Sequence, residues 1–128
     1  MNPPPNEPLL PPPDDTARAL VWRLLGQTGV ATLAVLEAGS GHPLASRTSY
    51  ACDDDGAPLI LTSRLAAHTA ALEHDARCSL LVGEPGAGDP LAHPRITLIG
   101  RALRLSRDSA DGQRARARYL AALPKAAL

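Results

Sequence analysis

Two different spacings of apolar residues run along the chain, and they predict both helices and strands. Over residues 15–26 the apolar positions recur at helical spacing, which predicts a helix. Asp14, Asp15 and Thr16 stand at its start and offer an N-cap and a negatively charged first turn. Similar spacing predicts two further helices, over 64–74 and 107–122.

Short apolar or alternating stretches rich in β-branched residues predict strands over 29–37, 44–52, 57–63, 77–84 and 95–106. The Asp-Asp-Asp-Gly sequence at 53–56 predicts a tight turn between the second and third of them, and Gly100 a bulge or bend in the last. Strands and helices do not alternate regularly, so a parallel sheet is not favoured. The pattern predicts a mainly β (α+β) fold, a small antiparallel barrel with peripheral helices. Such a sheet leaves edges that dimerisation would cover, so we expect a homodimer.

The length and composition fit one globular domain. The chain has 128 residues, of which 45% are hydrophobic and 20% charged. Seven of the 13 prolines lie in residues 1–13, which predicts a disordered, partly polyproline tail before a domain over 14–128.

Charge and cysteine content indicate which partners and which cellular location to expect. Thirteen basic and 13 acidic residues balance, so no global field favours nucleic acid or an anionic membrane as a partner. No apolar stretch approaches the roughly 20 residues that span a bilayer, and the first residues do not resemble a signal peptide. Cys52 and Cys78 show no paired spacing, which favours free thiols over a disulfide. We therefore expect a cytoplasmic protein.

One stretch, LTSRLAAHTAAL at 61–72, raises a functional question. Ser63 and Arg64 stand where a predicted strand passes into a predicted helix. One interpretation is structural: Ser63 caps the helix and Arg64 is a solvated surface residue. The other is functional, because a helix N-terminus flanked by a hydroxyl and a guanidinium is suited to bind a phosphate.

The preceding predicted strand offers a second arginine. If the hairpin closes around the acidic turn, residues 46–50 lie opposite 59–63, and Arg47 comes near Ser63. Hydroxyl groups would then gather around the two arginines, from Thr48, Ser49, Ser63 and Thr69. Such a cluster suits a dianionic phosphate.

Other chemistry has weaker support. The four histidines lack metal-ligand spacing, and the glycines of 85–91 follow no nucleotide-binding pattern. Ser63 and His68 lack the elbow motif of a nucleophile, and the three aspartates lack the spacing of a Ca²⁺ loop. We assign no metal site and no catalytic acid or base.

The segments 43–82 and 88–102 resemble the FMN-binding split β-barrel family, that is, the pyridoxamine 5′-phosphate oxidase-like superfamily. The motifs SRLAxHTxxL, GDPLAHPR and TLxGRA occur in this order, and the resemblance is strongest to the branch concerned with haem-iron utilisation. It covers roughly residues 14–124. It implies a homodimer with FMN at the subunit interface.

The resemblance also implies roles for individual residues. Arg47 and Thr48 would contact the flavin and its phosphate tail, and Ser63 and Arg64 would bind the phosphate. His68 and Thr69 would line the same groove, and Arg95 would reach the cofactor from the other subunit.

The chain departs from its relatives in ways that bear on function. Ala51-Cys52 stands where oxidases of the family carry a Lys, and Leu65 stands where they carry a basic residue. The C-terminal segment that binds pyridoxal phosphate in those oxidases, and the strand that completes the barrel, are not found after residue 124. Vitamin B6 oxidation is therefore not expected.

Three functions follow as alternatives. The first is an FMN-dependent oxidoreductase acting on an unidentified small-molecule redox substrate. The second is a haem-binding or haem-utilisation protein that uses the same groove, with His68 or His93 as the candidate iron ligand. The third is a flavin-binding relative without catalytic activity.

Overall fold

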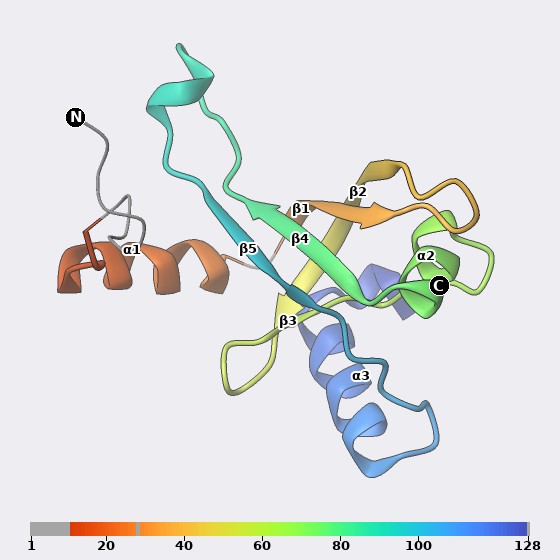
Figure 1. Cartoon of the computed structure of the whole chain (residues 1–128). Coiled ribbons are helices and arrows are strands. Elements are labelled where there is room, and N and C mark those ends of the chain that lie inside the picture. The colour runs from red at the N-terminus through yellow and green to blue at the C-terminus, as the bar shows by residue number, and fades with distance from the viewer. Residues whose placement is uncertain (1–10, 28, 128) are drawn as a thin grey trace.

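A computed structural model describes residues 11–27 and 29–127. Five antiparallel strands form one sheet in the order β3-β2-β1-β4-β5, curled into a half-barrel with helices around it (Figure 1). The elements are α1 (Asp15–Gly26), β1 (Gly29–Leu36), β2 (Pro43–Cys52), β3 (Pro58–Leu59), α2 (Ala67–His74), β4 (Arg77–Val82), the 3₁₀ turn η1 (Pro90–Ala92), β5 (Ile96–Arg101), α3 (Ala110–Ala122) and the 3₁₀ turn η2 (Pro124–Ala127). The predicted fold class is thus confirmed, whereas most of the predicted tail lies outside the described residues.

The central strand β1 shows why the sheet has two different faces. Ala31, Leu33 and Val35 are buried, while the residues between them are only partly covered. Because successive side chains of a strand point to opposite faces, the buried set marks the core face. Helix α2 packs against this face through Ala71, which is fully buried. The core therefore lies on one side of the sheet.

The opposite face of the sheet carries apolar side chains that remain exposed. Val30, Leu81 and Ile99 are 39%, 40% and 85% exposed. The register places these three residues and Arg47 on the same face, because Arg47 pairs with Thr32, Thr32 with Leu81, and Leu81 with Thr97. We call this surface, defined by Val30, Arg47, Leu81 and Ile99, the outer face.

Several predicted elements are shorter than expected, and for three of them the cause is clear: two strands end with their pairing, and one helix begins at its cap. The third strand ends at Leu59 instead of residue 63, because its pairing with β2 ends there. The fifth ends at Arg101 instead of residue 106, because its partner β4 begins at Arg77, and beyond that pair only the Ala102 N–H still donates to the Ala76 carbonyl, at 2.8 Å. The last helix begins at Ala110 instead of 107, since Ser109 caps it by accepting from the Gly112 N–H at 2.9 Å.

Gly100 was predicted to mark a bulge or bend, and the structure has no bulge there. Gly100 pairs with Cys78 in an unbroken register that runs from Arg77↔Arg101 to Val82↔Ile96. The alternation of side chains therefore continues through Gly100.

Candidate functional site

The turn that precedes α2 differs from the predicted capped helix. The Ser63 Oγ accepts from the Leu65 N–H at 3.1 Å, and the Ser63 carbonyl accepts from the Ala66 N–H at 3.2 Å. Residues 63–66 therefore form a turn of their own, here called the 63–66 turn. Helix α2 begins only at Ala67, with Ala66 as its N-cap. The prediction that Ser63 caps a helix over 64–74 is wrong, because its hydroxyl is used within the turn.

The N-terminus of α2 retains the properties of an anion site. Ala66 offers no side-chain cap to the first N–H groups of the helix. Unpaired N–H groups and the helix dipole attract negative charge. Arg64 is exposed two residues before the N-cap. The Ser63 hydroxyl is also exposed, and because its oxygen is the acceptor from Leu65, its own proton is available to a ligand.

The side chains predicted to gather around a phosphate do not all lie on the same face of the sheet. Arg47 and Ser49 are exposed on the outer face, whereas Thr48 pairs with buried Ala31 and lies on the core face. The Thr48 hydroxyl donates to the Ser49 carbonyl at 3.2 Å. Thr48 is therefore not placed beside Arg47.

The predicted proximity of Arg47 and Ser63 stays a prediction. The β2–β3 pairs Ala51↔Leu59 and Cys52↔Pro58 differ by one residue from the expected register. The observed register, if continued, would place residues 47 and 63 opposite each other. The paired strand ends before that point. Within residues 11–27 and 29–127, no hydrogen bond or ion pair joins the two side chains.

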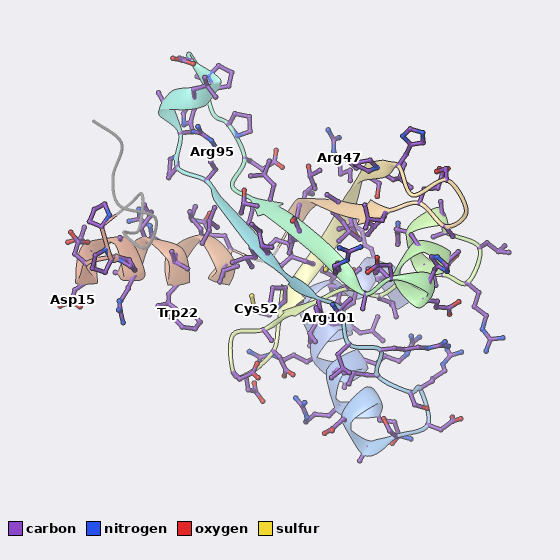
Figure 2. All side chains as sticks on the ribbon, in the orientation of Figure 1. Asp15, Trp22, Arg47, Cys52, Arg95 and Arg101 are labelled. Carbon is purple, nitrogen blue, oxygen red and sulfur yellow. The ribbon has the colours of Figure 1, made fainter. Side chains whose placement is uncertain are left out.

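Arg95 lies on a long hairpin arm, residues 83–95, which projects from the sheet between β4 and β5 (Figures 1 and 2). Its guanidinium donates to the carbonyls of Leu91 and His93 at 3.1 and 3.3 Å. Gly83 permits the close approach at the base of the arm, because a Cβ there would meet the Pro94 carbonyl oxygen at 2.5 Å. Arg95 thus braces the arm, and its predicted contact with a cofactor in a second subunit stays untested.

The two histidines considered as iron ligands have different surroundings. The His93 Nε2 lies 2.8 Å from the Ala87 carbonyl, and the ring packs on Gly86, where a Cβ would come within 2.7 Å of it. His93 therefore helps to shape the arm. His68 is half-buried in the first turn of α2 and stays the better placed candidate.

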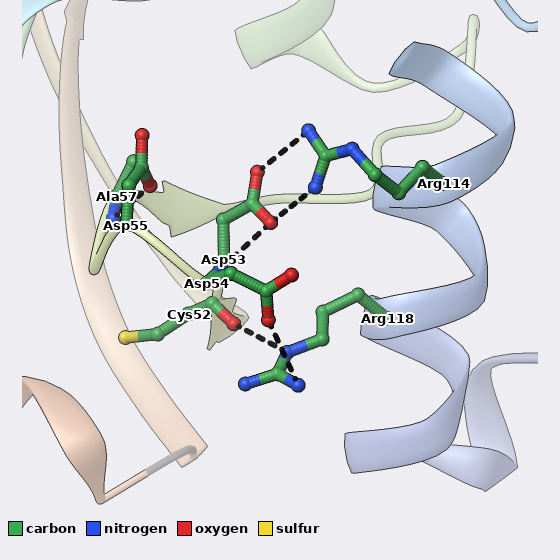
Figure 3. Close-up of polar contacts among 7 residues, drawn as sticks. All are labelled: Cys52, Asp53, Asp54, Asp55, Ala57, Arg114 and Arg118. Atoms are coloured by element: carbon green, nitrogen blue, oxygen red, sulfur yellow. Dashed lines mark hydrogen bonds and ion pairs between the residues drawn. The ribbon is translucent and has the colours of Figure 1, made fainter. Parts of the chain in front are cut away.

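The acidic turn is part of a structural clamp. Asp53 makes a bidentate ion pair with Arg114 at 2.6 and 3.1 Å (Figure 3), and Arg114 holds the pKa of Asp53 below its usual value. One helical turn later, Arg118 pairs with Asp54 at 3.1 Å. The two arginines fasten α3 to the β2–β3 turn. This pairing was not predicted, although the two arginines are four residues apart, a spacing that indicates one face of a helix.

An open groove of about 730 Å³, which was not predicted, lies at the C-terminal end of α1. It is lined by Arg23, Gln27 and Glu84, among others, and by the buried Tyr50. No motif or spacing in the sequence indicated it, because its walls come from α1, β1, β2 and β4.

The cysteines are free, as predicted, and are not suited to nucleophilic chemistry. Burial raises the pKa of both Cys52 and Cys78, so each thiol stays protonated at neutral pH. Within the described ranges no helix is long and apolar enough to cross a membrane.

The chain is similar in sequence to a known protein family and to a characterised relative. Residues 19–127 match the family model described as pyridoxamine 5′-phosphate oxidase. The chain is 42% identical over 88 residues to the non-canonical, chloroplastic heme oxygenase HOZ of Arabidopsis thaliana, a match that covers 67% of this chain and 26% of that protein.

Two solved structures are similar to this chain in both fold and sequence. A protein of unknown function from Agrobacterium tumefaciens is 36% identical with a TM-score of 0.78, covering 95% of this chain and 51% of that one. A heme binding protein from Mycobacterium smegmatis is 37% identical with a TM-score of 0.75, covering 84% of this chain and 43% of that one. This chain thus spans about half, or less, of the length of these relatives.

Proposed function

The chain belongs to the pyridoxamine 5′-phosphate oxidase family, and from that premise we propose that it is a flavoprotein that binds FMN through the 63–66 turn and acts as an oxidoreductase. The observation that carries the proposal is this turn, where an exposed guanidinium, a hydroxyl with a free proton and an uncapped helix N-terminus occur together. The phosphate of FMN is a dianion, which these three kinds of donor would hold.

The residues of the chain would bind and orient the cofactor, and the bound flavin would supply the electron transfer. Arg64 and Ser63 would hold the phosphate tail. Arg47, exposed on the outer face, would contact the flavin or its tail, as the family resemblance implies. No acid or base is assigned to the reaction.

We also propose that the protein forms a homodimer through the outer face. The exposed side chains of Val30, Leu81 and Ile99 give this face an apolar surface that helix α2, on the other side, does not cover. Burial of such a surface against a second copy would remove it from water. Because Arg47 lies on the same face, FMN bound there would lie near the subunit interface.

Binding of haem is the second candidate function. It is favoured by two relatives, at 42% and 37% identity, whose names refer to heme. The 63–66 turn would accept a haem propionate as it would a phosphate, because both are anions. His68 would then be the candidate iron ligand.

Spectroscopy of the purified protein tests both proposals. The protein is titrated separately with FMN, riboflavin and hemin, and the FMN complex is then treated anaerobically with a reduced nicotinamide. Flavin binding with bleaching of the flavin bands supports the oxidoreductase. Binding without reduction would favour a flavin-binding relative without catalytic activity. A Soret shift with hemin, together with no FMN binding, would overturn the FMN proposal in favour of haem.

A further inference from the structure

We propose that Thr69 is a positioning residue that shapes the 63–66 turn, and that it does not donate to the bound anion. Its hydroxyl donates to the Ser63 carbonyl oxygen at 2.6 Å, a bond that spans six residues. A hydroxyl has a single proton, so this proton is already used. The Ser63 hydroxyl differs, because it accepts from the Leu65 N–H and keeps its own proton for a ligand.

The bond to Thr69 also sets the direction of a backbone donor. The Ser63 carbonyl accepts from both the Thr69 hydroxyl and the Ala66 N–H, and is therefore held toward the start of α2. In a trans peptide the C=O and the following N–H point in opposite directions. The Arg64 N–H therefore points out of the turn. In the part of the chain that the structure describes, no acceptor is found for it.

This arrangement matters for anion binding, and here the inference rests on the proposed function of the turn. Anions are held by N–H and O–H donors, and a carbonyl oxygen turned toward them is repulsive. Thr69 keeps the Ser63 carbonyl away from the position at which Arg64 and the Ser63 hydroxyl meet a ligand. Without its hydroxyl the turn would lose this fixed direction, although no group that touches the anion is removed.

The test compares Thr69→Val, which replaces the hydroxyl by a methyl group of similar shape, with Thr69→Ser, which retains the hydroxyl. Thr16→Val, at an exposed position of α1, is the matched control. Amide hydrogen exchange is measured at Leu65 and Ala66 in the ligand-free protein. We expect about five- to tenfold faster exchange in Thr69→Val, from the loss of one hydrogen bond, and no change in Thr69→Ser or the control.

Affinity for FMN and riboflavin is measured on the same proteins. We expect about tenfold weaker FMN binding in Thr69→Val, rescue by Thr69→Ser, and unchanged riboflavin binding. Unchanged amide exchange in Thr69→Val would overturn the inference, and so would a loss of FMN affinity with the turn intact, which would make Thr69 a direct ligand. If the unmodified protein binds no FMN, the proposed function fails, and the exchange result alone still decides whether Thr69 shapes the turn.

Discussion

The hydroxyl of Tyr50 lies 3.1 Å from the carbonyl oxygen of Leu24. It also lies within reach of the Leu25 and Gln27 carbonyls, at 3.2 and 3.0 Å. The last carbonyls of a helix have no partner inside the helix. Tyr50, which is 1% exposed on β2, therefore satisfies the C-terminal end of α1 and ties this helix to the sheet.

We expect Tyr50→Phe to lower the free energy of unfolding by about 0.5–1.5 kcal/mol, the net value of one hydrogen bond. The Gln27 N–H and the Cys52 thiol still donate to the Leu24 and Leu25 carbonyls, so the phenol is not their only donor. The measurement is denaturant unfolding, with an unchanged m-value showing that the folded state stays equally compact. A change in stability below about 0.5 kcal/mol, the usual size for an exposed position, would mean that water replaces the phenol at these carbonyls.

Arg64→Ala tests the phosphate assignment directly. We expect it to weaken FMN binding by about 1.5–3 kcal/mol, the range for a hydrogen bond to a charged group. Riboflavin, which lacks the phosphate, should bind almost equally well to both proteins. Calorimetric or fluorescence titration measures both affinities.

The control for Arg64 is Arg107→Ala, which removes the same charge from an exposed site in the loop before α3. Equal losses for FMN and riboflavin would contradict a phosphate contact. Equal losses for Arg64→Ala and Arg107→Ala would indicate only a long-range effect of charge.

The clamp between Asp53 and Arg114 predicts a dependence of stability on pH. The Asp53 side chain is 10% exposed, and its pKa is lowered mainly by the hydrogen bonds from Arg114. A carboxyl whose pKa is lower in the folded protein contributes stability above its unfolded pKa, about 4. That contribution is lost as the pH falls through the lower, folded value.

Arg114→Gln should therefore be less stable than the unmodified protein at neutral pH, and the difference should shrink as the pH falls below about 4. Thermal unfolding over a pH series measures this, with Arg107→Gln as the control for loss of charge. A difference that stays constant down to the lowest pH would contradict a role for the Asp53 carboxylate.

Ile99→Arg tests the proposed subunit interface. Ile99 is 85% exposed on the outer face, so a charge there should change the stability of a single subunit by no more than about 0.5 kcal/mol. At a buried dimer interface the same charge would be unpaired, and we expect light scattering to show monomers. Gln113→Arg, at an exposed position of α3, should remain dimeric. A monomeric unmodified protein, or a dimeric Ile99→Arg, would contradict the proposed interface.

The elements that the sequence predicted well are those whose signals are local. The first helix was placed at its observed bounds, because Asp14 accepts from the Ala17 N–H at 2.8 Å, as an N-cap residue does. The first strand, predicted over 29–37 from a short apolar run, was placed within one residue of its observed bounds, Gly29–Leu36. The acidic turn was also correctly placed, since the Gly56 N–H donates to the Asp53 carbonyl at 2.9 Å.

Features that depend on other parts of the chain were decided only by the tertiary structure. Strand β3 ends where its pairing with β2 stops, and β5 ends opposite the first residue of β4, and a single strand carries no information about its partner. Alternation along a strand already separates Thr48 from Arg47, but only the pairing of Thr48 with buried Ala31 shows that Thr48 is the one on the core face.

The candidate site shows the same division. By itself the sequence determined that the hydroxyl of Ser63 and the guanidinium of Arg64 come shortly before a helix. It did not determine that Ser63 belongs to a separate turn, because that depends on how its carbonyl and hydroxyl are shared among Leu65, Ala66 and Thr69. Hydrogen bonds of equal plausibility compete for the same oxygen atoms, and only packing of the folded chain selects among them.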